Sequence, residues 1–257
     1  MYDKFSGDYD RFVNWTDRLA FEMPFLETQV QLIQKDTGQS LAILDSACGT
    51  GMHAIALAKA GYKVFGADLF PEMIEKSKVN AQQSGLPVTF KTAGFGELTN
   101  AFGEEQFHLV LCLGNSLPHI LTQKDLAAAL ADFFATLRTG GMLFIQNRNF
   151  DAVVQRKERW MEPQAFQADV EEWIFQRFYD YLEDGNIRFN IVTLKKALDA
   201  DWQAEVGSTL LRPQLYGELS RLLEEVGFRD IKAYGSMQGE PFSAVESGNL
   251  IITAIKA

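Results

Sequence analysis

The stretch LAILDSACGTGMHA, residues 41–54, joins a short apolar run to a glycine-rich turn and then to a helical segment. Gly49, Gly51 and Ala54 have the spacing G-x-G-x-x-A. Glycines at such a turn let the backbone bend sharply and approach a ligand that a Cβ would obstruct. The turn leads into a predicted helix N-terminus, which favours negative charge. By this spacing alone, the turn suits the phosphates of a dinucleotide.

Four more apolar runs follow the first one along the chain. They cover residues 62–68, 87–93, 107–114 and 141–147. Near-continuous apolarity predicts strands that are covered on both faces. The segments between them read as helices: Pro71 and Gly85 mark the ends of one, and Thr122 is the expected N-cap of another that runs on to the glycine pair at 140–141. We therefore expect an α/β fold with a Rossmann-like, doubly wound, mostly parallel seven-stranded sheet.

The alternation of apolar strand segments with helical segments stops after this region. Two largely alternating segments flank Asp184–Gly185–Asn186, a strong hairpin signal. A helix over 212–227 and strands over 228–234 and 249–256 then return the chain to the α/β pattern. We expect a helical N-terminal cap at residues 1–40. The core is expected in two pieces, 41–150 and 213–257, and an antiparallel β insertion over the active site at 151–212.

The composition limits the function classes. The net charge of −10 argues against a nucleic-acid partner and against binding to an anionic membrane surface. The first residues lack the apolar core of a signal peptide, and no uninterrupted apolar run is long enough to span a membrane. The two cysteines have no metal-ligand spacing. We expect a cytoplasmic protein that acts on a small molecule and uses no metal, and the oligomeric state stays open.

Two acids refine the interpretation of the turn. Asp45 comes just before the glycines, where a carboxylate would repel a pyrophosphate and attract an ammonium group. Asp68 ends the second apolar run, which is the position of an acid that binds ribose hydroxyls. Asp68 suits a dinucleotide and a nucleoside cofactor equally, whereas Asp45 favours the nucleoside.

The segments LDSACGTG and VFGADL together resemble motif I and the following acidic strand of the S-adenosylmethionine-dependent methyltransferases with a Rossmann-like fold. That motif usually has a glycine where this chain has Ala47, a departure that requires a negative φ there. The resemblance implies S-adenosylmethionine as cofactor, with Asp45, Ala47, Gly49 and Gly51 around its methionine part and Asp68 on its ribose. An NAD-dependent oxidoreductase and an inactive cofactor-binding module remain alternatives.

Further cofactor contacts follow from the same resemblance. They are expected at Leu69, Gly94, Phe95 and Leu113. Many relatives carry an aspartate near Gly94 that binds the adenine, and this chain does not; Phe95 either flanks the adenine or packs in the core. From the cap, we expect Tyr9 to face the sulfonium through its ring. Arg18 is a candidate for the methionine carboxylate.

Two later segments, LCLGNSLPHI and NRNFD, resemble the LGNS…H and HRNYD segments of glycine N-methyltransferases and glycine/sarcosine methylating enzymes, which share ACGTG. This resemblance covers about residues 41–151. It implies that Asn115 lies beside the reacting amine, that His119 lines the same pocket, and that Arg148 binds the acceptor carboxylate. The competing interpretations are a turn cap for Asn115, a loop hydrogen bond for His119 and an ion pair of Arg148 with Asp151 or a surface acid. O- or C-methylation of another small metabolite is the alternative reaction.

Overall fold

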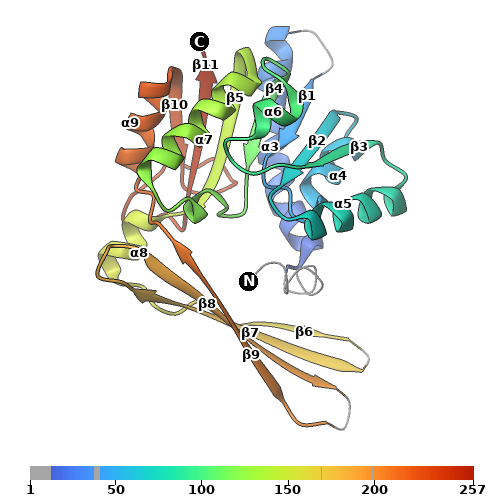
Figure 1. The fold of residues 1–257 in the computed structure, drawn as a ribbon, viewed down its shortest axis with the longest axis vertical. Helices are drawn as coiled ribbons and strands as arrows, with labels where there is room; N and C mark the ends of the chain where they lie inside the picture. Colours follow the sequence, from blue (N-terminus) through green and yellow to red (C-terminus); the bar gives the residue numbers. More distant parts are fainter. Residues whose placement is uncertain (1–12, 38–40, 169, 198–199) are drawn as a thin grey trace.

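The chain is described by a computed structural model that covers residues 13–37, 41–168, 170–197 and 200–257 (Figure 1). A large central sheet carries helices on both faces, and a smaller antiparallel sheet extends from one end of it. No helix in these ranges is long and apolar enough to cross a membrane.

The large sheet has seven strands in the order β10-β11-β5-β4-β1-β2-β3. These are β1 Ala42–Asp45, β2 Lys63–Asp68, β3 Val88–Thr92, β4 Phe107–Cys112, β5 Leu137–Arg148, β10 Phe228–Tyr234 and β11 Asn249–Lys256. Strands β1 to β5 run parallel to one another, and β11 runs antiparallel to both of its neighbours, β10 and β5. The predicted Rossmann-like, mostly parallel seven-stranded sheet is confirmed. Because β1 pairs with both β2 and β4, their carboxyl ends form the switch point at which such sheets bind ligands.

Two buried apolar clusters lie on opposite faces of this sheet. One face packs against α3 Trp15–Thr37, α4 Met52–Lys59 and α5 Pro71–Ser84. The other packs against α6 Leu98–Phe102, α7 Gln123–Thr136 and α9 Tyr216–Val226. This two-sided cover explains why the strands read as continuous apolar runs.

The helix ends follow the local chemistry for the most part. Pro71 begins α5, and Gly85 ends it with a left-handed φ of 66°. The Thr122 hydroxyl accepts a hydrogen bond from the Asp125 N–H at 3.1 Å, so it caps α7 as predicted. The prediction that α7 runs to the glycine pair is wrong, because β5 begins at Leu137, where that residue pairs with Phe107.

The smaller sheet has four antiparallel strands. They are β6 Gln164–Gln167, β7 Glu171–Tyr181, β8 Ile187–Ala197 and β9 Gln203–Leu211. The β7–β8 turn has Gly185 at φ 83°, and the Asn186 N–H donates to Asp184 Oδ1 at 2.9 Å. A third apolar cluster, which includes Phe150 and Tyr179, joins this sheet to helix α8 Phe150–Arg156. Neither α8 nor β6 had been predicted.

Of the predicted N-terminal cap, the structure describes helix α3, which lies against the large sheet. Tyr9, the expected sulfonium contact, lies outside the described residues. Arg18 is on the first turns of α3.

Candidate active site

The glycine turn after β1 needs its glycines. Gly49 and Gly51 have φ values of 54° and 83°, a region that side chains disfavour. A Cβ on Gly51 would lie 2.8 Å from Ser77 Cβ, which is too close. Ala47 is absent from the described non-glycine residues with positive φ, so it meets the condition for replacing the usual motif glycine. The turn therefore keeps the motif I geometry despite the alanine.

Asp68, at the end of β2, holds this turn in place. Its Oδ2 accepts a hydrogen bond from the Gly49 N–H at 2.9 Å, and its Oδ1 accepts one from the Phe70 N–H at 3.0 Å. Burial raises the pKa of the Asp68 carboxyl, while these backbone hydrogen bonds act in the opposite direction. The acid predicted to bind ribose thus also fixes the loop beside it.

Asp45 is an almost fully buried acid, 1% exposed. Its Oδ1 has no hydrogen-bond partner among the residues that the structure describes. Burial raises the pKa of Asp45 to about 6, helped by the neighbouring charge of Asp68 and opposed by His53 and Arg18. A buried oxygen without a partner costs free energy, which a cationic donor would recover. This oxygen fits the ammonium group of an amino-acid ligand.

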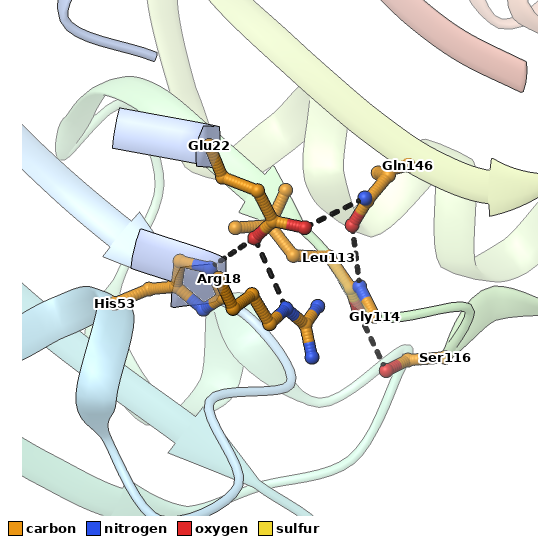
Figure 2. A network of polar contacts seen from close by, with 7 residues as sticks. All are labelled: Arg18, Glu22, His53, Leu113, Gly114, Ser116 and Gln146. Atoms are coloured by element: carbon orange, nitrogen blue, oxygen red, sulfur yellow. Dashed lines mark hydrogen bonds and ion pairs between the residues drawn. The ribbon is translucent and has the colours of Figure 1, made fainter. Parts of the chain in front are cut away.

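A second buried acid, Glu22, joins three elements at this edge of the sheet (Figure 2). Arg18 Nε and Gln146 Nε2 donate to its two carboxylate oxygens at 3.1 and 3.0 Å, and His53 Nε2 lies 2.6 Å from Oε2. Burial alone would raise the pKa of Glu22, but the His53 hydrogen bond and the Arg18 charge outweigh it and lower the pKa to about 2. The network fixes α3 against α4 and β5.

The same network reaches the loop after β4. Gln146 Oε1 accepts a hydrogen bond from the Gly114 N–H at 3.0 Å (Figure 2). The Gln146 backbone carbonyl accepts a second one from the Asn115 N–H at 3.1 Å. Arg18 Nη2 lies 3.5 Å from the point that a Cβ on Gly114 would occupy. The Arg18 guanidinium therefore lies directly beside Gly114, with its Nε held by Glu22. Sequence reasoning missed Glu22 and Gln146.

The structure brings together Asn115 and Arg148, two of the three predicted acceptor residues. Asn115 Oδ1 accepts a hydrogen bond from the Arg148 N–H at 3.0 Å, and Asn115 itself has a positive φ of 63°. Arg148 Nη2 donates to Glu158 Oε1 at 2.8 Å. Asp151, the expected partner in the competing interpretation, instead accepts from the Tyr216 N–H at 2.9 Å. Arg148 therefore does pair with an acid, as the competing interpretation allows, but that acid is the partly exposed Glu158 and not Asp151.

His119, the third predicted acceptor residue, lies in the short 3-10 helix Leu117–His119. Burial lowers its pKa to about 4, and a hydrogen bond with the Leu210 backbone opposes that shift. The imidazole is therefore neutral at physiological pH. This contact places His119 beside β9, and its part in acceptor binding stays a prediction.

The remaining predicted cofactor residues lie in different surroundings. Leu69 is 59% exposed, and its Cδ1 lies 3.0 Å from the point that a Cβ on Gly94 would occupy. Phe95 packs edge-on against Phe133 with ring centroids 5.7 Å apart, which supports a core contact. Leu113 is buried in the cluster under α3 and α4. The cofactor roles of these residues stay predictions.

Comparisons with known proteins agree with this geometry. Residues 43–141 match the family described as methyltransferase domain. The glycine/sarcosine N-methyltransferase of Parasynechococcus marenigrum is 28% identical over 92% of this chain and 78% of its own length. The glycine/sarcosine N-methyltransferase of Aphanothece halophytica is 29% identical over 91% of this chain and 82% of its own length. An S-adenosylmethionine-dependent methyltransferase structure from Clostridium acetobutylicum has a TM-score of 0.77 and 15% identity, covering 99% of this chain and 98% of that one.

The matched domain, the sheet order and the turn with its two acids define an enzyme, a methyltransferase that uses S-adenosylmethionine. Within that class, the chain is related to the glycine/sarcosine N-methyltransferases. The choice between dinucleotide and nucleoside that the glycine spacing left open is thus decided in favour of the nucleoside.

Proposed function

We propose that the enzyme methylates the amino nitrogen of a small amino acid such as glycine or sarcosine. The observation that carries this proposal is the hydrogen bond from the Arg148 N–H to Asn115 Oδ1. This hydrogen bond joins the Asn115 side-chain amide to the Arg148 main chain, close to where β4 and β5 end. A guanidinium suits a carboxylate, and an amide oxygen suits an amine hydrogen. The names of the sequence relatives point in the same direction.

The proposed cofactor site presents groups of opposite charge. Asp45 offers its buried Oδ1 to the ammonium of the methionine part, and Arg18 offers its Nη groups, one of which lies beside Gly114, to the carboxylate. Asp68, held at the end of β2, would accept from the ribose hydroxyls. Residues from three different elements thus match the three polar parts of an amino-acid-bearing nucleoside.

When bound, S-adenosylmethionine supplies an electrophilic methyl group on a sulfonium. The protein contributes mainly by position: Arg148 anchors the acceptor carboxylate and Asn115 orients the deprotonated amine. The neutral His119 lines the pocket, and aromatic side chains of the smaller sheet exclude water. A free amine only has to lose its proton to solvent before it reacts, so this scheme requires no dedicated general base.

The test is a product assay with purified enzyme and S-adenosylmethionine. Glycine and sarcosine are compared with a panel of other amines, phenols and carboxylic acids. N-methylated amino acids as the favoured products would support the proposal. Preferred methylation of a phenol or of a carbon acid would instead establish the O- or C-methyltransferase alternative.

A further inference from the structure

Gln214 is a fully buried amide that belongs to no motif and that the proposed function does not use. It lies in the connection between β9, which ends at Leu211, and α9, which begins at Tyr216. Its Nε2 donates a hydrogen bond to the Leu117 carbonyl at 2.9 Å, and its Oε1 accepts one from Asn147 Nδ2 at 3.1 Å. A carbonyl oxygen can only accept, so the contact with Leu117 fixes which way round the Gln214 amide lies.

The two partners of Gln214 lie close in sequence to the proposed acceptor residues. Asn147 directly precedes Arg148 on β5, whereas Leu117 begins the 3-10 helix two residues after Asn115. The side chain of Gln214 therefore joins the strand of the proposed carboxylate anchor to the loop of the residue proposed to orient the amine. It is a second link between these segments, in addition to the hydrogen bond from the Arg148 N–H to Asn115 Oδ1.

The connection that carries Gln214 also contacts the next residue of the 3-10 helix. The Arg212 N–H donates to the Pro118 carbonyl at 2.8 Å, one residue beyond the carbonyl of Leu117. Arg212 is itself paired with Glu218 on α9. Two consecutive carbonyls of the helix are thus held by a connection that is anchored on α9.

The hydrogen bond between Gln214 and Leu117 is shielded from water, because both residues are 0% exposed. Removing the donor would leave a buried carbonyl unsatisfied, which costs more than the loss of an exposed hydrogen bond. Asn115, two residues away, has a positive φ of 63°, a conformation that persists only when the surrounding structure holds it. A loosened 3-10 helix would therefore displace Asn115.

We propose that Gln214 is a positioning residue for methyl transfer, which sets the separation between Asn115 and Arg148 and so the place of the acceptor amine. The inference rests on the proposed function in one respect, namely that Asn115 and Arg148 face the acceptor. Gln214 acts through these two residues. Its loss should lower the kcat/KM for the acceptor and leave the affinity for the cofactor unchanged.

The test compares Q214E, Q214M and Q176E with wild type, using the acceptor that the product assay favours. The carboxylate in Q214E cannot donate to the Leu117 carbonyl, and the thioether in Q214M has no donor either. Gln176 is the matched control, because its Nε2 also donates to a backbone carbonyl, that of Met161 at 2.9 Å, but it lies on β7. We expect kcat/KM to fall about tenfold to hundredfold in both Gln214 variants, the scale for a misplaced positioning group. Q176E should behave as wild type.

Two further readouts separate positioning from a general loss of packing. The first is the affinity for S-adenosylhomocysteine, measured by calorimetry, which should stay at the wild-type value. The second is pH: a protonated carboxyl donates as the Gln214 amide does, so the kcat/KM ratio of Q214E to wild type should rise as the pH falls. The ratio for Q214M should stay constant. Dividing by wild type removes the titration of other groups, His119 and the pair of Arg212 with Glu218 among them.

Wild-type kcat/KM in Q214M overturns the inference, and so does a fall in S-adenosylhomocysteine affinity as large as the fall in kcat/KM. A Q214E ratio that does not rise at acid pH also overturns it. Should Q214E fail to fold, Q214M decides, because lowered kcat/KM with unchanged cofactor affinity supports the inference.

The outcome for the proposed function is read separately. If the favoured acceptor is a phenol and the Gln214 variants lose activity on it with cofactor affinity retained, the inference stands and the proposed function alone is overturned. If sarcosine is favoured and both Gln214 variants methylate it as wild type does, the inference alone is overturned.

Discussion

Gln146 Nε2 donates a hydrogen bond to Glu22 Oε1 over 3.0 Å and so ties strand β5 to a helix that lies 124 residues earlier in the chain. Both side chains are buried, and Glu22 also contacts Arg18 and His53. We expect Glu22→Gln to lower the free energy of unfolding by about 1.5–3 kcal/mol, the range for a hydrogen bond to a charged group. Urea denaturation measures this loss. Glu75→Gln, at an exposed surface pair with Lys78, is the control and should be neutral.

This contribution should depend on pH. The folded-state pKa of Glu22 is lowered from 4.5 to about 2, so its stabilisation is complete above pH 4.5 and is lost as the pH falls toward 2. The difference in unfolding free energy between wild type and Glu22→Gln should therefore shrink in acid. A difference that stays constant from neutral pH to about pH 3 would contradict the assignment.

Asp45 should show the opposite sign in the ligand-free enzyme. Its pKa is raised from 3.8 to about 6, so the folded protein loses stability as the pH rises through that window. Asp45→Asn should raise the melting temperature without ligand at neutral pH, because it removes a buried charge. It should also weaken S-adenosylhomocysteine binding by about tenfold or more, and wild-type binding should weaken below about pH 6. Calorimetric titration of S-adenosylhomocysteine above and below pH 6 checks the effect of the substitution and the effect of pH on binding.

Asp68→Ala should weaken cofactor binding by about tenfold or more, through the lost charged hydrogen bonds to the ribose. The change also frees the Gly49 N–H, which Asp68 now holds. Unchanged calorimetric affinity for S-adenosylhomocysteine would remove Asp68 from the site. Thermal shift with NAD as the second ligand should show no stabilisation of wild type.

Arg148→Ala should impair turnover of an amino-acid acceptor, because the bound acceptor carboxylate would lose its charged partner, a loss that costs about 2–5 kcal/mol when the pair is desolvated. The defect should appear in the acceptor kcat/KM, with cofactor affinity retained. Arg138→Ala serves as the control, because Arg138 is exposed and its Nε donates to the Glu105 carbonyl. Wild-type turnover by Arg148→Ala on the true acceptor would refute its assignment.

Gly51→Ala tests the turn itself. A Cβ there would meet Ser77 Cβ at 2.8 Å and the Phe90 ring at 2.9 Å, and φ is 83°. Gly61 has a similar φ of 94° but open space around it, so Gly61→Ala reports the backbone strain alone. We expect Gly51→Ala to lower the melting temperature more than Gly61→Ala and to abolish cofactor binding. Equal effects would mean that the crowding is relieved by repacking.

Local chemistry was enough to predict most elements of the large sheet from the sequence. Pro71, Gly85 and Thr122 act within a few residues of where they stand, so their effects could be inferred without the fold. The start of β5 could not, because it depends on pairing with Phe107 on another strand. Contacts between side chains far apart in the sequence, such as that of Glu22 with Gln146, could not be predicted for the same reason.

The site residues show the same difference between what local sequence predicts and what long-range packing determines. Asn115 and Arg148 were named from motifs and do meet, but sequence proximity suggested Asp151 as the acid for Arg148. The actual partner, Glu158, is reached because the chain turns through α8 before entering the smaller sheet. Glu22 and Gln146 carry no motif at all, and only the packing of α3 onto β5 reveals them.

Gln146 binds two consecutive residues. Its side-chain Oε1 accepts a hydrogen bond from the Gly114 N–H, and its backbone carbonyl accepts one from the Asn115 N–H. Gly114 lies next to Arg18 on the proposed cofactor side, and Asn115 contacts Arg148 on the proposed acceptor side. Donor and acceptor pockets thus share one anchoring point, and shifting it would displace both together. An engineer who wants a new acceptor without losing the cofactor would therefore leave Gln146 unchanged.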